Sequence, residues 1–291
     1  MIPVEMMRKI RRIQINTSHI VDQLLAGGWH SAFKGSGIEF EEVRPYQAGD
    51  DVRSIDWNVT ARSGEPFIKL FREERELAVM LLVDVSASQN LGTHHQTKRE
   101  LLTELSATLA FSAIKNNDKV GLTMFTDRVE KSIPPRKGTR HVLRLIRELL
   151  YHESVGTGTR LSEALDHLNR TASRRSVVFV VSDFQDSDFQ RSMKIARQRH
   201  DIIPMVIDDQ REFEMPNVGL IRLRDPETDQ VVELDTASRR HRIAYESFMR
   251  QRAASRDMLL RRMRMAPIHF RTGEDFVAPL QKYFHDREVR R

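Results

Sequence analysis

Apolar runs of strand length alternate with segments of helical periodicity from Ala78 to the end of the chain. Bounded apolar runs of about four to eight residues are typical of buried strands, and apolar positions repeating with the helical period indicate helices. The apolar runs predict strands at 78–84, 119–125, 176–182, 202–208 and 267–271, with a short antiparallel edge strand at 129–133. The periodic segments predict helices at 98–115, 140–150, 161–169, 189–198 and 274–284. This alternation predicts an α/β fold with a doubly wound, mostly parallel sheet flanked by helices.

Two regions interrupt the alternation. Residues 1–77 begin with a basic amphipathic segment at 6–25 and continue with strand-like pieces at 38–43, 54–59 and 66–71. Residues 218–234 indicate a hairpin, because two apolar stretches flank a turn sequence from Asp225 to Asp229. An isolated hairpin is only marginally stable in water, so we expect it to pair with strands of the first 77 residues in a small accessory β module. The predicted domains are 1–77, with the N-terminal helix and the accessory β segment, and 78–291, with the inserted hairpin and a basic helix at 218–265.

Composition is that of an ordinary globular protein. Hydrophobic residues make up 40% of the 291 residues and charged residues 30%, which allows a full core and argues against disorder. No apolar stretch approaches the roughly 20 residues of a membrane-spanning helix. The chain has no cysteine, which excludes disulfides and thiolate metal ligands and favours a reducing compartment. Because residues 1–15 carry charges where a signal peptide would be hydrophobic, we expect a cytoplasmic protein.

The net charge of +6 raises a nucleic-acid hypothesis, since basic surfaces attract phosphate groups. Much of the excess lies in residues 239–264, where arginines alternate with apolar residues at roughly helical spacing. This pattern predicts an amphipathic basic helix. Docking of that helix on the rest of the protein, or on an acidic partner, is favoured over nucleic acid because net charge is a weak guide to partners.

Oxygen-bearing side chains gather where predicted strands end. Asp84, Ser86 and Ser88 follow the first strand of the α/β region, and Asp183 follows the strand at 176–182. Ligands in open α/β sheets bind beyond the carboxyl ends of the strands, so both acids are expected at one edge. Thr159 can add its hydroxyl from the start of the helix at 161–169. These hard oxygen ligands suit Mg²⁺, or another divalent cation such as Mn²⁺, with waters completing the shell.

Each of these residues also has a structural interpretation. Aspartate and serine serve as turn and cap residues, so the short motif alone is a weak signal. Thr159 can act simply as a helix cap, and Thr157 competes with it for the ligand role. The combination in this order, with every member at a strand end or a helix start, favours a metal site.

These residues carry a family resemblance. Asp84-x-Ser86-x-Ser88 followed by Thr159 and Asp183 resembles the metal-ion-dependent adhesion site of a von Willebrand factor type A domain. Within residues 35–62, the string Gly-Asp-Asp-Val-Arg-Ser-Ile-Asp-Trp resembles the signature of the bacterial domain-of-unknown-function family 58, whose members carry it fused to a type A domain. The resemblance implies a von Willebrand factor type A-like fold. It also implies partnership with a MoxR-type AAA+ ATPase in the assembly or maturation of other proteins.

Two positions depart from the usual type A pattern, although neither removes a ligand. Gln89 follows the second serine where Met or Gly is common, and Phe184 follows the last aspartate where Gly is common.

The 35–62 signature allows two interpretations. Nearly balanced charges surround the aromatic residues Tyr46, Trp57, Phe67 and Phe71. Because buried charges require strong pairing, a structural network of ion pairs is favoured. A partner-docking face is the alternative, and a second metal site at Asp50 and Asp51 ranks last.

No complete catalytic site is recognisable in the sequence. Phosphatases with an aspartyl nucleophile resemble Asp-x-Asp in their first motif, and Ser86 stands where the second acid would be. No Ser-His-Asp set or phosphate-binding loop replaces it. We therefore expect a non-catalytic, Mg²⁺-dependent protein-interaction module in which a partner's acidic side chain completes the metal shell. A nucleic-acid-associated protein and, less strongly, a Mg²⁺-dependent phosphohydrolase are the alternatives.

Overall fold

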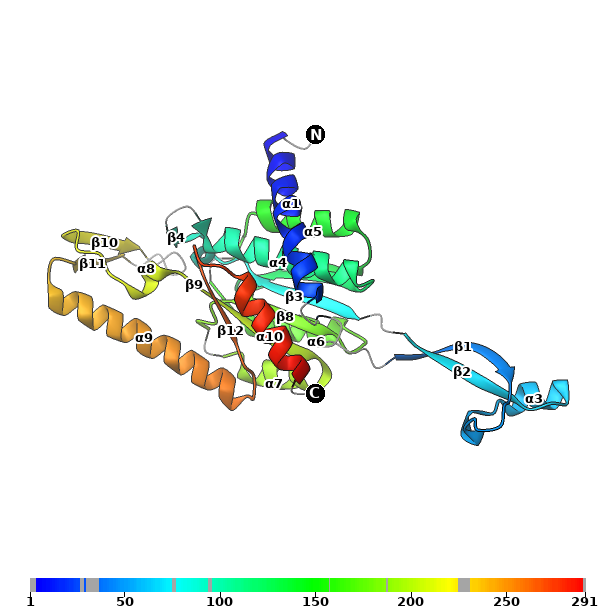
Figure 1. Cartoon of the computed structure of the whole chain (residues 1–291). Coiled ribbons are helices and arrows are strands. Elements are labelled where there is room, and N and C mark those ends of the chain that lie inside the picture. Colours follow the sequence, from blue (N-terminus) through cyan, green and yellow to red (C-terminus); the bar gives the residue numbers. More distant parts are fainter. Residues whose placement is uncertain are drawn as a thin grey trace. The chain divides into compact units, whose positions relative to one another are not determined.

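The computed structural model describes residues 4–26, 29, 37–74, 77–93, 96–156, 158–186, 188–224 and 231–289. The chain forms two compact units, Phe33–Leu77 and the remainder, each described below by itself. The larger unit is a three-layer α/β structure in which helices cover both faces of a central sheet (Figure 1).

Six strands form the central sheet in the order β12-β9-β8-β3-β6-β7. All pair in parallel except β7, which lies antiparallel to β6 at one edge. The doubly wound, mostly parallel sheet predicted from the sequence is therefore confirmed, including its antiparallel edge strand. The strands are β3 (Ala78–Asp84), β6 (Lys119–Phe125), β7 (Val129–Arg136), β8 (Val177–Ser182), β9 (Asp201–Asp208) and β12 (Ile268–Arg271).

The helices divide between the two faces of this sheet. Alternate residues of β3 and β8 pack with α6, α7 and the C-terminal end of α9 in one core cluster. The other face is covered by α4, with α1, α5 and α10 packed around it (Figure 1). The helices are α1 (Val4–Ala26), α4 (Lys98–Lys115), α5 (Thr139–Tyr151), α6 (Leu161–Thr171), α7 (Gln190–Arg199), α8 (Gln210–Phe213), α9 (Arg239–Arg262) and α10 (Val277–Val289).

Helix α1 belongs to the larger unit and packs on α4. Because α4 lies between the sheet and α1, twelve of its eighteen residues are buried, and these include small polar residues as well as apolar ones. Trp29, which follows α1, is fully buried and stacks on Phe179 of β8 at 6.1 Å. The predicted division at residue 77 grouped this helix with the accessory segment, whereas these apolar contacts join it to the α/β unit.

The smaller unit is an antiparallel ribbon of β1 (Gly37–Pro45) and β2 (Phe67–Glu74). Between its strands lie the 3-10 helix η1 (Val52–Ser54) and the helix α3 (Trp57–Ser63). The strand predicted at 54–59 is wrong because Asp56 caps α3 by accepting hydrogen bonds from the backbone N–H groups of Asn58 and Val59. Capping satisfies backbone donors that a strand would have paired across a sheet.

The predicted hairpin forms as β10 (Leu220–Arg224) and β11 (Val231–Asp235). These strands make a two-stranded sheet of their own, and β1 and β2 make another, so the prediction that all four share one sheet is wrong. The turn at 225–229 lies outside the described residues. After the 3-10 helix η2 (Ala87–Asn90), the short strands β4 (Gly92–Thr93) and β5 (Gln96–Thr97) pair in antiparallel orientation. No helix among the residues described above is long and apolar enough to cross a lipid bilayer.

Candidate metal centre

The two predicted acids lie on adjacent strands at the point where the sheet reverses its strand order. Strand β3 pairs with β6 on one side and with β8 on the other, so the chain runs first to one side and then to the other. Asp84 is the last residue of β3, and Asp183 follows β8 directly. Both side chains are buried, with Asp84 fully enclosed. This is the place in the fold where open α/β sheets bind their ligands.

The loop after β3 brings the two serines to the same site. The backbone N–H of Ser86 donates to Asp84 Oδ1 at 2.9 Å, and the Ser86 and Ser88 hydroxyl oxygens lie 3.0 Å apart. From β8, the Ser182 hydroxyl donates to Asp84 Oδ2 at 2.8 Å. Asp84, Ser86, Ser88 and Asp183 thus form one cluster, and Ser182 is a member that the sequence did not single out.

Gln89 occupies the space between these oxygens. Its Nε2 lies 3.4 Å from Asp84 Oδ2, 3.3 Å from Asp183 Oδ2 and 3.4 Å from Ser88 Oγ. The side-chain oxygen of Gln89, Oε1, is buried, and no hydrogen-bond donor among the described residues reaches it. The amide nitrogen therefore stands among three oxygens that would suit a cation, beside a fourth oxygen without a partner. This donor set fits a hard divalent cation.

Thr159 lies at the same edge of the sheet, half-buried, in the loop before α6. The next residue, Arg160, donates its N–H to Thr126 O at 2.9 Å, and Thr126 directly follows β6. The end of β6 meets the end of β3, since Val85 N donates to Phe125 O at 2.9 Å. Thr159 therefore lies near the ends of β6 and β3. Its role as a metal ligand stays a prediction that rests on this position. Its competitor Thr157 lies outside the described residues.

The two carboxylates have opposite pKa shifts. Burial, followed by the negative charge of Asp183, raises the pKa of Asp84 to about 7. Burial also acts to raise the pKa of Asp183, but the Lys98 ammonium and other hydrogen-bond donors outweigh it and hold that pKa below its usual value. Around neutral pH, Asp183 is therefore ionised, while Asp84 is only partly ionised.

Lys98 is the functional candidate that sequence reasoning missed. It is the first residue of α4, is completely buried, and donates to Asp183 Oδ2 at 3.0 Å and to Glu212 Oε1 at 2.8 Å. Lysine is almost never fully buried unless it is paired. Nothing in the sequence near Lys98 indicates either acid, because they lie 85 and 114 positions further along the chain.

Phe184 adopts a left-handed backbone conformation, with φ of 53°. This is the position where type A domains commonly carry glycine, which takes such angles without steric cost. The Phe184 side chain is buried and packs edge-on against Phe189 at 5.9 Å. Apolar packing thus offsets the backbone strain in the loop that carries Asp183.

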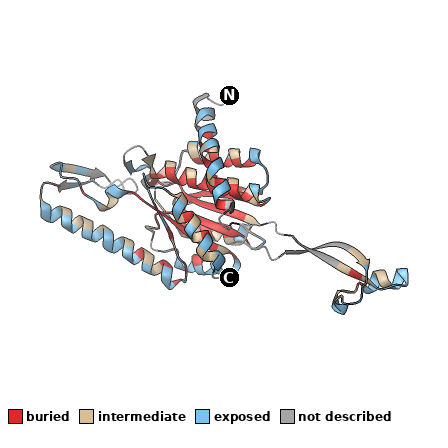
Figure 2. Ribbon diagram, in the orientation of Figure 1, coloured by how far each residue is buried: buried red, intermediate tan, exposed pale blue. Residues whose placement is uncertain are grey.

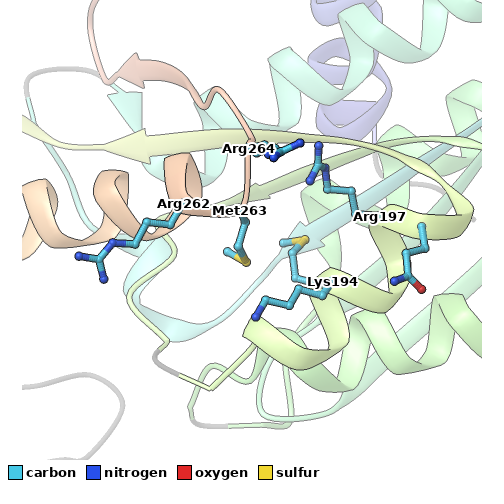
Figure 3. Close-up of a pocket in the computed structure, with 7 residues that line it drawn as sticks. Lys194, Arg197, Arg262, Met263 and Arg264 are labelled. Atoms are coloured by element: carbon cyan, nitrogen blue, oxygen red, sulfur yellow. The ribbon is translucent and has the colours of Figure 1, made fainter.

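One cavity of about 370 Å³ is formed by α7 and the C-terminal end of α9, near the starts of β9 and β12. Figure 3 shows that Lys194, Arg197, Arg262 and Arg264 line it, so it is unsuited to a cation.

Among the described residues there is no group of three or more His, Cys, Asp or Glu side chains arranged to hold a metal. A cation at the sheet edge would therefore depend on hydroxyl and amide oxygens in addition to the two acids.

Fold and site together define a doubly wound α/β protein with a cluster of acids and hydroxyls at its switch point. The chain belongs to the family described as protein of unknown function DUF58, whose model matches residues 42–255. The predicted membership of that family is thereby confirmed.

Relatives extend along nearly the whole chain. Uncharacterized proteins of Mycobacterium bovis (Mb1516) and Mycobacterium tuberculosis (Rv1480) are each 31% identical over 286 residues, which cover 96% of this chain and 88% of the relative. The uncharacterized protein YeaD of Bacillus subtilis is 25% identical over 182 residues, covering 62% of this chain and 43% of YeaD.

Solved structures with a similar course of the chain are more distant. An aerotolerance-related membrane protein from Bacteroides fragilis aligns with 14% identity and a TM-score of 0.47, covering 74% of this chain and all of that one. The VWA domain of SpRpn10 aligns with 10% identity and a TM-score of 0.40, covering 70% of this chain and 93% of that domain.

Proposed function

We propose that this protein is a non-catalytic interaction module that binds a partner protein through a divalent cation, Mg²⁺ or Mn²⁺. The observation that carries the proposal is the convergence of Asp84, Ser86, Ser88 and Asp183 on one buried spot at the switch point of the sheet. These four residues would hold the cation, with Thr159 from the start of α6 as a fifth ligand. The bound cation would supply a Lewis-acidic contact for one oxygen of the partner.

Charge supports a carboxylate as that oxygen. The serine hydroxyls are neutral, and one of the two carboxylates is already paired with Lys98 at 3.0 Å. A divalent cation among these groups would remain under-neutralised. An acidic side chain from a partner would complete its shell, whereas a neutral donor would leave excess positive charge in a buried place.

The nature of the partner is inferred from the family. The family resemblance implies that proteins with this signature act together with MoxR-type AAA+ ATPases. We therefore infer that such an ATPase, or its client, is the protein that offers the carboxylate. The module would then act in the assembly or maturation of other proteins. The lack of cysteine in the whole chain supports a cytoplasmic setting.

Calorimetric titration with MgCl₂ tests the first step. The wild type is expected to give a saturable heat, and Asp84→Asn, which removes one carboxylate ligand without changing side-chain size, is expected to abolish it. Asp166→Asn on α6, a half-buried aspartate outside the cluster, is the matched control and should bind like the wild type. Equal heats from the wild type and Asp84→Asn would remove the metal from the proposal.

Co-purification with a MoxR-type ATPase tests the second step. Binding is expected with MgCl₂ and should be lost with EDTA or in Asp84→Asn. Binding that persists in both would show that the partner does not use the cation.

A further inference from the structure

Lys98 stands where neither burial nor helix electrostatics favours a cation. Its side chain has no exposed surface. It is also the first residue of α4, where the helix macrodipole repels positive charge. Two acids offset these costs, Asp183 at 3.0 Å and Glu212 at 2.8 Å. Taking an ammonium group out of water is strongly unfavourable, so a buried ammonium persists only with good partners.

The ammonium is held firmly in place. Thr97 and Glu100 form a capping box that fixes the first turn of α4. On the other side, Glu212 belongs to a second capping box, with Asp209, that starts α8. The lysine thus lies between two rigid helix starts, and its charge is a permanent feature of the space beside Asp183.

Gln89 adds a neutral hydrogen-bond donor to the same space. Its amide N–H groups point at oxygens of both aspartates and of Ser88, at 3.3 to 3.4 Å. Amide hydrogens carry only partial charge, and these distances are long for hydrogen bonds, so they satisfy the carboxylates weakly. A divalent cation would compensate the carboxylates far better than the amide does. The Lys98 ammonium, by contrast, carries a full positive charge and makes short hydrogen bonds to Asp183 and Glu212.

We propose that Lys98 is a built-in counter-cation of the candidate metal centre, which neutralises Asp183 and thereby keeps the affinity of the centre for a divalent cation low until a partner carboxylate arrives. Gln89 fills the cation's place in the meantime. This inference rests on the proposed function, since it concerns the same cluster. Lys98 is a positioning residue, because it acts on the metal through Asp183.

A purely structural role for Lys98 makes a different prediction. If the lysine only ties α4 to α8, its removal will lower the stability of the fold and leave Mg²⁺ affinity unchanged or weaker. If it is a counter-cation, its removal will free Asp183 for the metal and strengthen Mg²⁺ binding. Affinity therefore separates the two roles, whereas stability alone does not.

Calorimetric titration of the full chain with MgCl₂ performs this test on two variants. Lys98→Met removes the charge at similar length. Lys98→Met/Glu212→Gln also removes the second acid, so that no uncompensated carboxylate remains on the α8 side to prevent folding. Lys115→Met, at the exposed end of the same helix, is the control. Circular dichroism verifies that each variant is folded.

We expect Lys98→Met to bind Mg²⁺ at least about tenfold more tightly than the wild type, since nearby charges interact strongly even at an effective dielectric constant of about 20. The double variant also loses the negative charge of Glu212, so it should gain less, while still binding Mg²⁺ more tightly than the wild type because Asp183 is the acid that belongs to the cluster itself. Lys115→Met should match the wild type. Equal or weaker binding by the folded double variant overturns the role of Lys98 while leaving the metal centre intact. Absence of Mg²⁺ binding in every folded variant overturns both the counter-cation and the proposed function.

Discussion

At the scale of single residues, the surroundings of two buried aspartates shift their pKa values in opposite directions. Asp84 and Asp183 lie on neighbouring strands, and both are buried. Only Asp183 has an ammonium group at 3.0 Å, so its pKa is lowered, while that of Asp84 rises to about 7. An acid that resists ionisation in the folded chain makes folding depend on pH.

The pH dependence of stability follows from Asp84. Between about pH 4 and pH 7 the folded chain holds a proton on Asp84 that the unfolded chain, with an ordinary pKa near 3.9, has lost. Unfolding therefore releases a proton, and the free energy of unfolding falls as pH rises through this window, by at most about 1.4 kcal/mol per unit. Asp84→Asn lacks this effect, so in EDTA its stability relative to the wild type should increase from pH 5 to pH 8.

Urea denaturation at pH 5 and pH 8 measures this difference. Asp166→Asn, remote from the cluster, should differ from the wild type equally at both values. A stability gap between Asp84→Asn and the wild type that stays constant with pH would contradict the raised pKa of Asp84.

At the scale of elements, the two ends of α9 differ: its C-terminal end packs in the core, and its N-terminal part is exposed. Arg256 is buried, and its guanidinium donates to Asp208 at 2.7 and 3.0 Å and to the Asp183 carbonyl at 3.1 Å. Leu260, one turn further on, is fully buried in the core cluster. Before Arg256 no residue of α9 is buried (Figure 2). Ile243 and Phe248 are more than half exposed. The basic helix predicted at 239–264 is present, and its last turns pack in the core cluster, while α8 also contacts it.

Loss of the buried arginine should loosen this end of α9. Arg256→Met leaves the Asp208 carboxylate buried and unpaired, so we expect it to lower the free energy of unfolding by roughly 3–5 kcal/mol. Arg250→Met, on the exposed part of the same helix, should change it by less than about 0.5 kcal/mol. Chemical denaturation monitored by circular dichroism gives both values. Similar effects of the two substitutions would show that the Arg256–Asp208 pair does not anchor the helix.

At the scale of the whole molecule, the family signature lies mainly in the smaller unit. Two of its acids have structural partners. Asp50 accepts two hydrogen bonds of 2.8 Å from Arg44, and Asp56 caps α3 and pairs with Lys69 at 3.4 Å. Trp57 is different, since 68% of its surface is exposed. A structural network therefore accounts for Asp50 and Asp56. The exposed tryptophan lacks such a role and favours the docking-face interpretation for that position.

The two roles predict different effects of neighbouring substitutions. Asp56→Ala removes the cap of α3 and should destabilise that helix by about 1–2 kcal/mol. Trp57→Ala removes an exposed side chain and should change its stability by less than about 0.5 kcal/mol. Hydrogen exchange of the amides in 57–63, followed by mass spectrometry, measures the helix locally. Equal acceleration by both variants would mean that Trp57 is part of the structural network.

The sequence by itself determined the elements and their order. Apolar runs end at Asp84 and Ser182, so strands end there, and parallel pairing then brings the following acids to one edge. The same local logic located α4, whose start is set by the Thr97 capping box. It failed at 54–59, where capping by Asp56 outweighed an apparent strand pattern. Local patterns succeed where the decisive interactions are between neighbours in the chain.

Only the tertiary structure decided which groups surround the acids and which elements pack together. Lys98 and Gln89 meet Asp183 across 85 and 94 positions of sequence, and such meetings leave no local pattern. The partner of α1 and the isolation of the β10–β11 hairpin are likewise set by which apolar faces remain to be covered after the sheet has formed. Burial then assigns the charges, because the surroundings of a carboxyl group, more than its residue type, set its pKa.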